Sequence, residues 1–142
     1  MSTADASRAA LRADGETILR KAIRAVLPDE AVRRALAGVQ FPGRVFLVAA
    51  GKAAWQMASV AHEALPALAG GVVVTKYGHA KGPIDGVACY EGAHPVPDEN
   101  GLRGTEAALA LTEGLRADDT VLFLLSGGGS ALFEQLLLPL GE

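Results

Sequence analysis

Three consecutive glycines stand between two serines, after an apolar run and before a helical one. Glycines at such a junction let the backbone approach an anion closely, and the free N–H groups of the turn then point at it. One helix N-terminus contributes only about 0.3–1 kcal/mol to an anion, so other groups must help. The pattern predicts a phosphate-binding turn, in which the two hydroxyls add donors or cap the helix, made of Ser126, Gly127, Gly128, Gly129 and Ser130. The alternative is a tight strand-to-helix turn in which the serine only caps.

Lys52 follows another apolar run, directly after Gly51, and stands at the start of a helical segment. The positive end of a helix dipole disfavours a cation, so the lysine is a locally inconsistent residue at this place. Residues that conflict with local structural preferences in this way are enriched at functional sites. A lysine there could clamp a phosphoryl group during its transfer, with Gly51 beside it in the same site. The alternative is a surface lysine whose stem lies along the protein and whose head is in water.

His94 lies between a strand-like segment and Pro95, in a loop that prolines make rigid. It could act as a base, a ligand or a hydrogen-bond donor near neutral pH, or it is a loop histidine fixed by its own backbone. Asp98 and Glu99 could hold a metal ion, but helix capping explains them more simply. The cysteine and the histidines have no zinc-ligand spacing, so no metal ligand is predicted and Cys89 is expected in the core.

Neither of the two standard nucleotide-binding fingerprints matches the chain. A Walker loop needs a glycine five residues before the Gly-Lys pair and a serine or threonine after it. Phe46 and Ala53 stand at those places. The dinucleotide pattern read from Gly127 and Gly129 would end in glycine or alanine, but it ends in Leu132. Any phosphate chemistry therefore uses another kind of loop.

Apolar periodicity divides the chain into helices and strands. An amphipathic helix is predicted over residues 6–27, where Pro28 ends it, and a second short helix over residues 29–37. Further on, continuous β-branched runs predict strands and apolar residues at helical spacing predict helices. The expected strands are 44–50, 71–76, 87–90 and 120–125, and the expected later helices are 52–65, 99–115 and 132–138.

This alternation predicts an α/β fold: a Rossmann-like, mostly parallel sheet with helices on both faces, in an incomplete domain. Residues 1–43 are expected to form an N-terminal helical segment that packs on the domain, and residues 44–142 the truncated α/β domain. Ligands of such sheets bind outside the carboxyl ends of the strands. Three turns are expected at that edge, namely residues 51–52, the loop of His94 and residues 126–130.

The composition excludes several classes of protein. Apolar residues make up 50% and charged residues 20% of the 142 positions, which suits one folded core. A net charge of -3, with both signs scattered, offers no basic patch for nucleic acid. No apolar run reaches the roughly 20 residues of a membrane helix, and the first residues contain no signal-peptide run. A single cysteine cannot form an internal disulfide, so the cytoplasm is the predicted location.

Four motifs occur together and in order: AGKAA at 50–54 with Met57 and Ala58 a turn later, VTKY at 74–77, GAHPVPDE at 92–99 and LSGGGSAL at 125–132. This succession resembles the type II glycerate 2-kinases, the glycerate kinase family whose second conserved region is called MOFRL. The similarity extends over residues 8–133, which is nearly the whole chain. On these motifs the chain resembles the N-terminal portion of such a kinase.

The resemblance implies ATP-dependent phosphorylation of glycerate at its 2-hydroxyl with Mg²⁺, on a Rossmann-like domain that faces a smaller C-terminal domain across a cleft. It implies that Lys52 is the catalytic lysine and that residues 126–130 are the glycine-rich active-site loop. Members of the family are longer, and their further part includes an arginine-bearing substrate region and the C-terminal domain.

Two other functions stay open on the sequence. Some relatives carry the label hydroxypyruvate reductase, although the chain shows no dinucleotide fingerprint. The other option is an α/β module that binds an anion or a partner without turnover, since phosphate-transfer sites usually need metal ligands and more than one cation. Glycerate and ATP are the expected ligands, no nucleic acid or membrane is expected as a partner, and a homo-oligomer is a further option.

Overall fold

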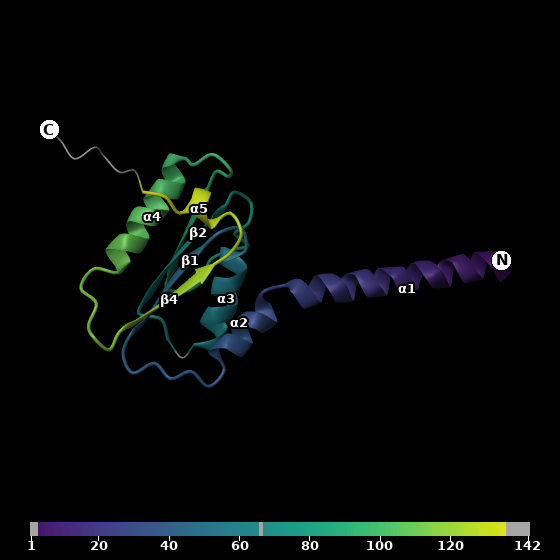
Figure 1. Ribbon diagram of the computed structural model, residues 1–142, viewed down its shortest axis with the longest axis horizontal. Helices are drawn as coiled ribbons and strands as arrows, with labels where there is room; N and C mark the ends of the chain where they lie inside the picture. Colours follow the sequence, from purple (N-terminus) through teal and green to yellow (C-terminus); the bar gives the residue numbers. More distant parts are fainter. Residues whose placement is uncertain (1–2, 66, 136–142) are drawn as a thin grey trace.

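Four parallel strands form the sheet of the described residues, which the computed structural model gives as 3–65 and 67–135 (Figure 1). The strands are β1 (Val45–Ala50), β2 (Gly70–Lys76), β3 (Val87–Gly92) and β4 (Thr120–Leu125). Their order across the sheet is β3-β2-β1-β4, and all three strand pairings are parallel. The predicted α/β class is confirmed.

β1 is buried at every residue, because β2 and β4 flank it and helices cover both faces of the sheet. Successive side chains of a strand point to opposite faces. Leu47 therefore joins one apolar cluster and Val48 the other, and Val73 and Val74 of β2 divide in the same way. A strand that is apolar at every position fits only between two covered faces, which explains the continuous apolar run that predicted β1.

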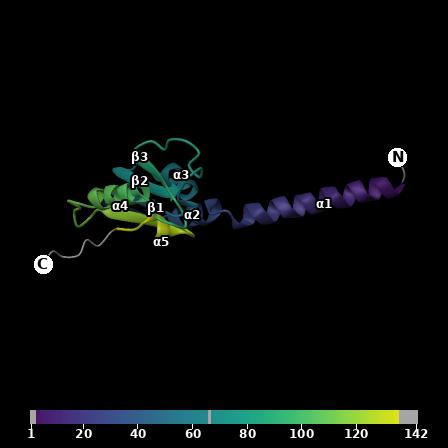
Figure 2. The ribbon, with the colours of Figure 1, turned by 90° about the horizontal axis from the view of Figure 1, so that it is seen from above.

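The helices of the domain lie in two layers (Figures 1 and 2). α2 (Asp29–Leu36) and α3 (Ala54–Ala64) cover one face through Val32, Ala58 and Ala61. α4 (Glu99–Leu111) and α5 (Gly129–Leu132) cover the other face through Ala108 and Leu132. Trp55 and Met57 are partly buried and pack against the first of these clusters.

Several element boundaries differ from those predicted. α3 begins two residues late, because Gly51 has φ +113° and the chain turns there. α4 ends at Leu111 and not at residue 115, since Gly114 has φ +68° and reverses the chain. The prediction of the last helix at residues 132–138 is wrong. α5 instead starts directly after Gly128, whose φ of +84° ends the glycine turn, and it stops at Leu132. Residues 136–138 lie outside the described residues.

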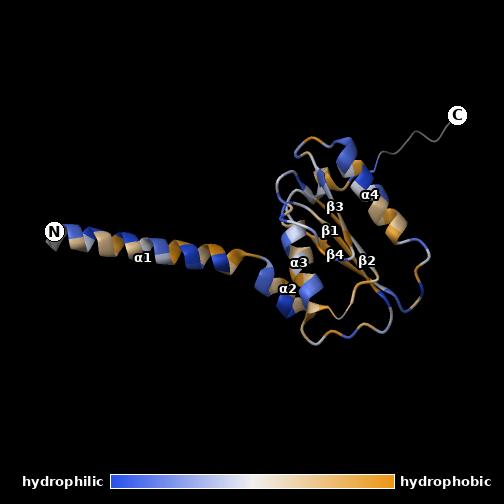
Figure 3. Cartoon of the chain, turned by 180° about the vertical axis from the view of Figure 1, so that it is seen from behind, coloured by the Kyte–Doolittle hydropathy of each residue, from blue (hydrophilic) through white to orange (hydrophobic). Residues whose placement is uncertain are grey.

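The N-terminal helix α1 (Thr3–Val26) projects away from the domain (Figures 1 and 2). Its apolar side chains alternate with charged ones (Figure 3), and they are exposed, with Leu11 at 69% and Val26 at 81%. α2 does pack on the domain, since its Val32 is buried. Of the segment 1–43, α2 and Phe41 pack on the domain. None of the described helices is long and apolar enough to cross a membrane.

Cys89 is exposed, so its predicted place in the core is wrong. In the described part of the chain β3 pairs only with β2, and it therefore lies at an edge of the sheet. An apolar stretch at an edge is covered less completely than one at the centre, and Ala88 and Cys89 of β3 are both exposed. Apolar content alone did not distinguish the two positions.

Candidate functional site

The turns after β1 and β4 lie at a reversal of strand order. The chain runs from β1 outward to β2 and β3, and it returns to β4 on the other side of β1. α3 follows β1 on one face of the sheet, whereas α5 follows β4 on the opposite face. The two turns therefore leave the carboxyl ends of two neighbouring strands and lead to opposite faces of the sheet. Open α/β sheets bind ligands at such a place. The predicted neighbourhood of residues 51–52 and 126–130 is confirmed.

Four hydrogen bonds join these two turns. The Ser126 N–H donates to the Ala50 carbonyl at 2.9 Å, and the Lys52 N–H donates to the Gly127 carbonyl at 2.9 Å. The Ala53 N–H donates to Ser126 Oγ at 3.0 Å. Ser126 Oγ in turn donates to the Ala50 carbonyl at 3.4 Å, and it does not cap α5. Of the two roles considered for this hydroxyl, capping is excluded, and its bonds hold the Lys52 turn.

Lys52, His94 and Gly128 converge at this edge. A Cβ built on Gly128 would stand 2.8 Å from His94 Nε2 and 3.3 Å from Lys52 Cε. Gly128 also has φ +84°, a left-handed conformation that L side chains rarely adopt. The structure thus brings together three residues that lie far apart in the sequence. Within the described residues, the ammonium of Lys52 has no ion-pair partner.

Gly51 is required by the crossing of the two turns. Its φ is +113°, and a Cβ there would overlap the side chain and the carbonyl of Ser126. The Gly51 N–H donates to the Val74 carbonyl at 3.1 Å. Its own carbonyl accepts a bond of 2.9 Å from the hydroxyl of Thr75, which is fully buried. Gly51 therefore lets the backbone of Lys52 approach the glycine turn, and it fixes the direction in which Lys52 leaves β1.

The glycine turn leaves two backbone donors free. The N–H groups of Gly127 and Gly128 have no acceptor among the described residues. A Cβ on Gly127 would meet nothing within 4 Å, so this residue faces open space. Gly129 starts α5 and packs on Leu125, while Ser130 is exposed. Unpaired adjacent amides at an open turn are a concave donor site of the kind that binds anions.

The loop of His94 is anchored at both ends. Asp98 caps α4, as predicted, through a bond of 3.0 Å from the Gly101 N–H to its Oδ1. Its Oδ2 accepts from the Tyr77 hydroxyl at 2.7 Å, and Asn100 Nδ2 donates to that hydroxyl, also at 2.7 Å. The bond from Tyr77, followed by that from Gly101, lowers the pKa of Asp98, and the same carboxylate raises the pKa of Tyr77. These bonds tie the His94 loop to the end of β2.

Comparison with known proteins decides the family. Residues 14–140 match the family described as a domain of unknown function, DUF4147. The chain belongs to this family. The DUF4147 chain is 56% identical over 124 residues to a D-glycerate 2-kinase of Thermotoga maritima, a match that covers 87% of the chain and 29% of the relative. It is 44% identical over 101 residues to a provisionally named hydroxypyruvate reductase of Agrobacterium vitis, covering 70% and 22% respectively.

A solved structure agrees with the sequence matches. The crystal structure of a glycerate kinase from Thermotoga maritima superposes with a TM-score of 0.80 at 52% identity. The match covers 90% of the DUF4147 chain and 31% of that structure. The resemblance to glycerate 2-kinases drawn from four motifs is thereby confirmed. The DUF4147 chain spans less than a third of the length of these relatives.

Sequence reasoning missed three residues of the DUF4147 site. Thr75 is a lone hydroxyl at the end of an apolar strand, and that position signals a bond to the next turn. His79 Nδ1 lies 2.8 Å from the Lys52 carbonyl, and Lys81 lines a hollow together with Lys52. The last two come from the turn after β2, which neighbours the turn after β1 only through the strand pairing. The sequence around them showed nothing beyond a Gly- and Pro-rich loop.

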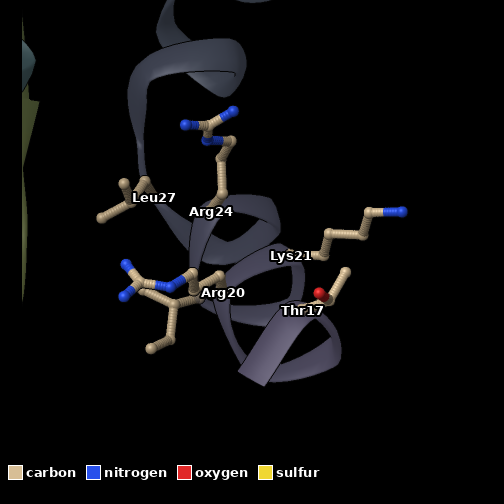
Figure 4. Close-up of a pocket in the computed structure, with 6 residues that line it drawn as sticks. Thr17, Arg20, Lys21, Arg24 and Leu27 are labelled. Carbon is tan, nitrogen blue, oxygen red and sulfur yellow. The ribbon is translucent and has the colours of Figure 1, made fainter. Parts of the chain in front are cut away.

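A different hollow lies on α1. Figure 4 shows its lining side chains, including Arg20, Lys21, Arg24 and Leu27. It measures about 470 Å³, but its lining residues all belong to the last turns of α1 and to Leu27, which directly follows that helix. A single helix cannot enclose a ligand, and none of the predicted site residues contributes to this hollow. The hollow on α1 is therefore not the candidate site.

Proposed function

We propose that this chain carries the phosphoryl-transfer site of an ATP-dependent glycerate 2-kinase, which forms 2-phosphoglycerate. The observation that carries the proposal is the convergence of Lys52, His94 and the free amides of Gly127 and Gly128 at the carboxyl edge of the sheet. Support from other proteins comes from the 56% identity to a D-glycerate 2-kinase. Both ligands are metabolites that fit the cytoplasmic location predicted from the sequence.

In the proposed reaction, the 2-hydroxyl oxygen of glycerate attacks the γ-phosphorus of ATP. A new O–P bond forms, the bond to the β,γ-bridging oxygen breaks, and ADP leaves with that electron pair. Catalysis of this kind consists mostly of positioning and of charge stabilisation on the transferring oxygens. The Lys52 ammonium and the amides of Gly127 and Gly128 supply positive charge and donors, and His94 takes the proton of the attacking hydroxyl.

Ser126 and Gly51 act on this reaction through the backbone. Ser126 Oγ holds the Ala53 N–H at 3.0 Å, and Gly51 allows the two turns to cross without a side chain between them. Both residues fix Lys52 relative to the glycine turn. A preorganised cation stabilises developing charge without reorganisation at the moment of transfer, so we assign positioning roles to these two residues.

Mg²⁺ is implied by the resemblance, but the described residues do not fit as its ligands. No three carboxylate, histidine or cysteine side chains gather among them. The two carboxylates nearest in sequence to His94 already have donors: Glu91 accepts from the His79 and Ala80 N–H groups, and Asp98 accepts from Tyr77 and Gly101. No step of the proposed reaction runs through a metal held by this part of the chain.

A chimeric enzyme tests the proposal. The matching 124-residue segment of the Thermotoga maritima enzyme is replaced by that of this chain, because the matched segments are 56% identical. The chimera is expected to make 2-phosphoglycerate from glycerate and ATP, as followed by phosphorus NMR. A Lys52→Ala chimera serves as the matched control and should fold but turn over poorly. A folded chimera that forms no product would contradict the proposed function.

Hydroxypyruvate reductase is the second candidate, and one relative at 44% identity favours it. That reaction needs a hydride donor, and neither glycine turn carries the dinucleotide pattern. The same chimera decides between the two functions. Oxidation of NADH or NADPH by hydroxypyruvate, followed by absorbance, supports the reductase if no phosphorylated product forms.

A further inference from the structure

Lys52 also lines a hollow on the side of the turn after β2. The hollow lies between that turn, the start of α3 and the corner before α2, and its polar lining comes from Lys52, Gln56, His79 and Lys81. We call it the Lys81 hollow. It measures about 280 Å³, just below the roughly 300–1,000 Å³ of small-molecule pockets. A single small group fits it, and a whole nucleotide does not.

Lys81 is held by a neutral hydrogen-bond partner. Its Nζ donates to Gln56 Oε1 at 3.1 Å, and Gln56 Nε2 donates to Asp29 Oδ1 at 2.8 Å. The ammonium also lies 6.0 Å from the centre of the Trp55 ring. An ammonium has three N–H donors, and a neutral amide accepts only one of them here. Among the described residues no carboxylate pairs with Lys81.

The turn that carries Lys81 is itself fixed. Glu91 Oε1 accepts from the backbone N–H groups of His79 at 3.0 Å and Ala80 at 2.9 Å. The indole N–H of Trp55 donates to the Gly82 carbonyl at 2.8 Å. The Glu91 carboxylate is thus used for the backbone of the turn. Lys52 and Lys81 thus both line this hollow, and among the described residues neither forms an ion pair, since the carboxylate of Asp29 bonds Gln56 instead.

We infer that the Lys81 hollow binds a phosphate dianion, with Lys52 and Lys81 as its cations. Two lysines without ion-pair partners concentrate positive charge at one small hollow, and a dianion offsets that charge while it accepts from their N–H donors. Lys52 belongs to both the hollow and the glycine turn, so an anion bound here lies beside the proposed transfer site. The inference rests on the proposed function, because both use the side chain of Lys52. The phosphate is either the terminal group of a nucleotide or that of a phosphorylated hydroxy acid.

Calorimetric titration of the chain at constant ionic strength tests the inference. The probes are inorganic phosphate, tripolyphosphate and 2-phosphoglycerate. Lys81→Gln removes the charge and keeps the length of the side chain, and it is expected to weaken phosphate binding roughly three- to tenfold, as for a charged group at an exposed site. Lys81→Arg should retain binding. Lys21→Gln makes the same change of charge on α1, outside the hollow, and should leave binding unchanged.

Equal phosphate affinity in wild type and Lys81→Gln would overturn the inference, and so would an equal loss in Lys21→Gln. Tighter binding of tripolyphosphate than of 2-phosphoglycerate assigns the hollow to a nucleotide, and the reverse order assigns it to a phosphorylated acid. A different result would contradict the proposed function. A folded chimera that transfers no phosphate, while the chain still binds phosphate through Lys81, removes the kinase and leaves the hollow in place.

Discussion

The hydroxyl of Ser126 accepts a hydrogen bond of 3.0 Å from the backbone N–H of Ala53, and so fastens the turn after β4 to the turn that carries Lys52. Ser126→Ala is expected to loosen this connection and lower kcat of the chimera roughly tenfold or more, because small misplacements of a catalytic group are costly. The free energy of unfolding should fall by only about 1 kcal/mol, the usual loss for one hydrogen bond.

Ser130→Ala is the matched control for this change, since Ser130 is exposed and belongs to the same turn. Steady-state kinetics and denaturant unfolding on both variants separate the two serines. A loss of turnover shared equally by both variants would argue that the hydroxyls act on the ligand and that the tie to Ala53 is unimportant.

Lys52→Ala is expected to lower kcat of the chimera by about 10²-fold or more, the order of loss for one preorganised stabilising group. The KM for ATP should change little, because this cation acts mainly on charge that develops in the transition state. The variant should fold normally, since the Lys52 ammonium has no ion-pair partner in the described part of the chain. Turnover at the wild-type rate would remove Lys52 from the catalytic site.

The glycine turn offers two substitutions with opposite expectations for stability. Gly127→Ala should change the free energy of unfolding by less than about 0.5 kcal/mol, because its Cβ meets open space. Gly128→Ala should cost about 1–2 kcal/mol or more, because φ is +84° and His94 lies against the new methyl group. Urea unfolding of the two variants measures this difference.

Binding separates the roles of the same two glycines. If the Gly127 and Gly128 amides cradle a phosphate, the methyl of the well-folded Gly127→Ala variant should obstruct the anion and weaken tripolyphosphate binding. Calorimetry on Gly127→Ala measures this effect without a change of fold. Unchanged affinity would mean that the glycines serve only the crossing of the two turns.

The strands were predictable from the sequence because burial on both faces leaves an unbroken apolar run. β4 appears at the predicted residues, and β1 and β2 differ by one residue at their starts. Lys52 and the glycine turn could be proposed from the sequence, because a cation at a helix start and three consecutive glycines both stand out at the end of such a run. Thr75, His79 and Lys81 were not found, since their roles depend on which strands are neighbours and on hydrogen bonds across the sheet edge.

The exposed face of β4 predicts self-association of the chain. Within the described residues β4 pairs only with β1, and Phe123 and Leu125 on it are 47% and 61% exposed. An open apolar edge strand pairs readily with another chain. Light scattering should therefore give a mass above the 14.6 kDa of one chain, and Leu125→Lys should return it toward that value. If Ile18→Lys on α1 has this effect and Leu125→Lys has none, the association runs through α1 instead.

The carboxylate of Asp119 joins β1 and β4 at the end of the sheet where these two strands begin. Asp119, whose side chain is 1% exposed, accepts from the Arg44 backbone at 3.1 Å, from the Arg44 guanidinium and from the Arg116 N–H at 2.7 Å. The Arg44 guanidinium, followed by these backbone donors, lowers the pKa of Asp119 well below its usual range. A carboxylate with a lowered folded pKa stabilises the protein above its unfolded pKa, near 3.9, and this contribution is lost as the pH falls toward the folded value.

Asp119→Asn should therefore lower the melting temperature at pH 7 and flatten its decline in acid. Asp118→Asn is the matched control, because Asp118 is the exposed neighbour, and it should change neither quantity much. Thermal unfolding between pH 2 and pH 7, followed by circular dichroism, compares the three proteins. Since Asp119 joins the starts of β1 and β4, its loss should loosen the two strands whose other ends carry Lys52 and the glycine turn. A wild-type melting profile in Asp119→Asn would show that this ion pair does not hold the strands together.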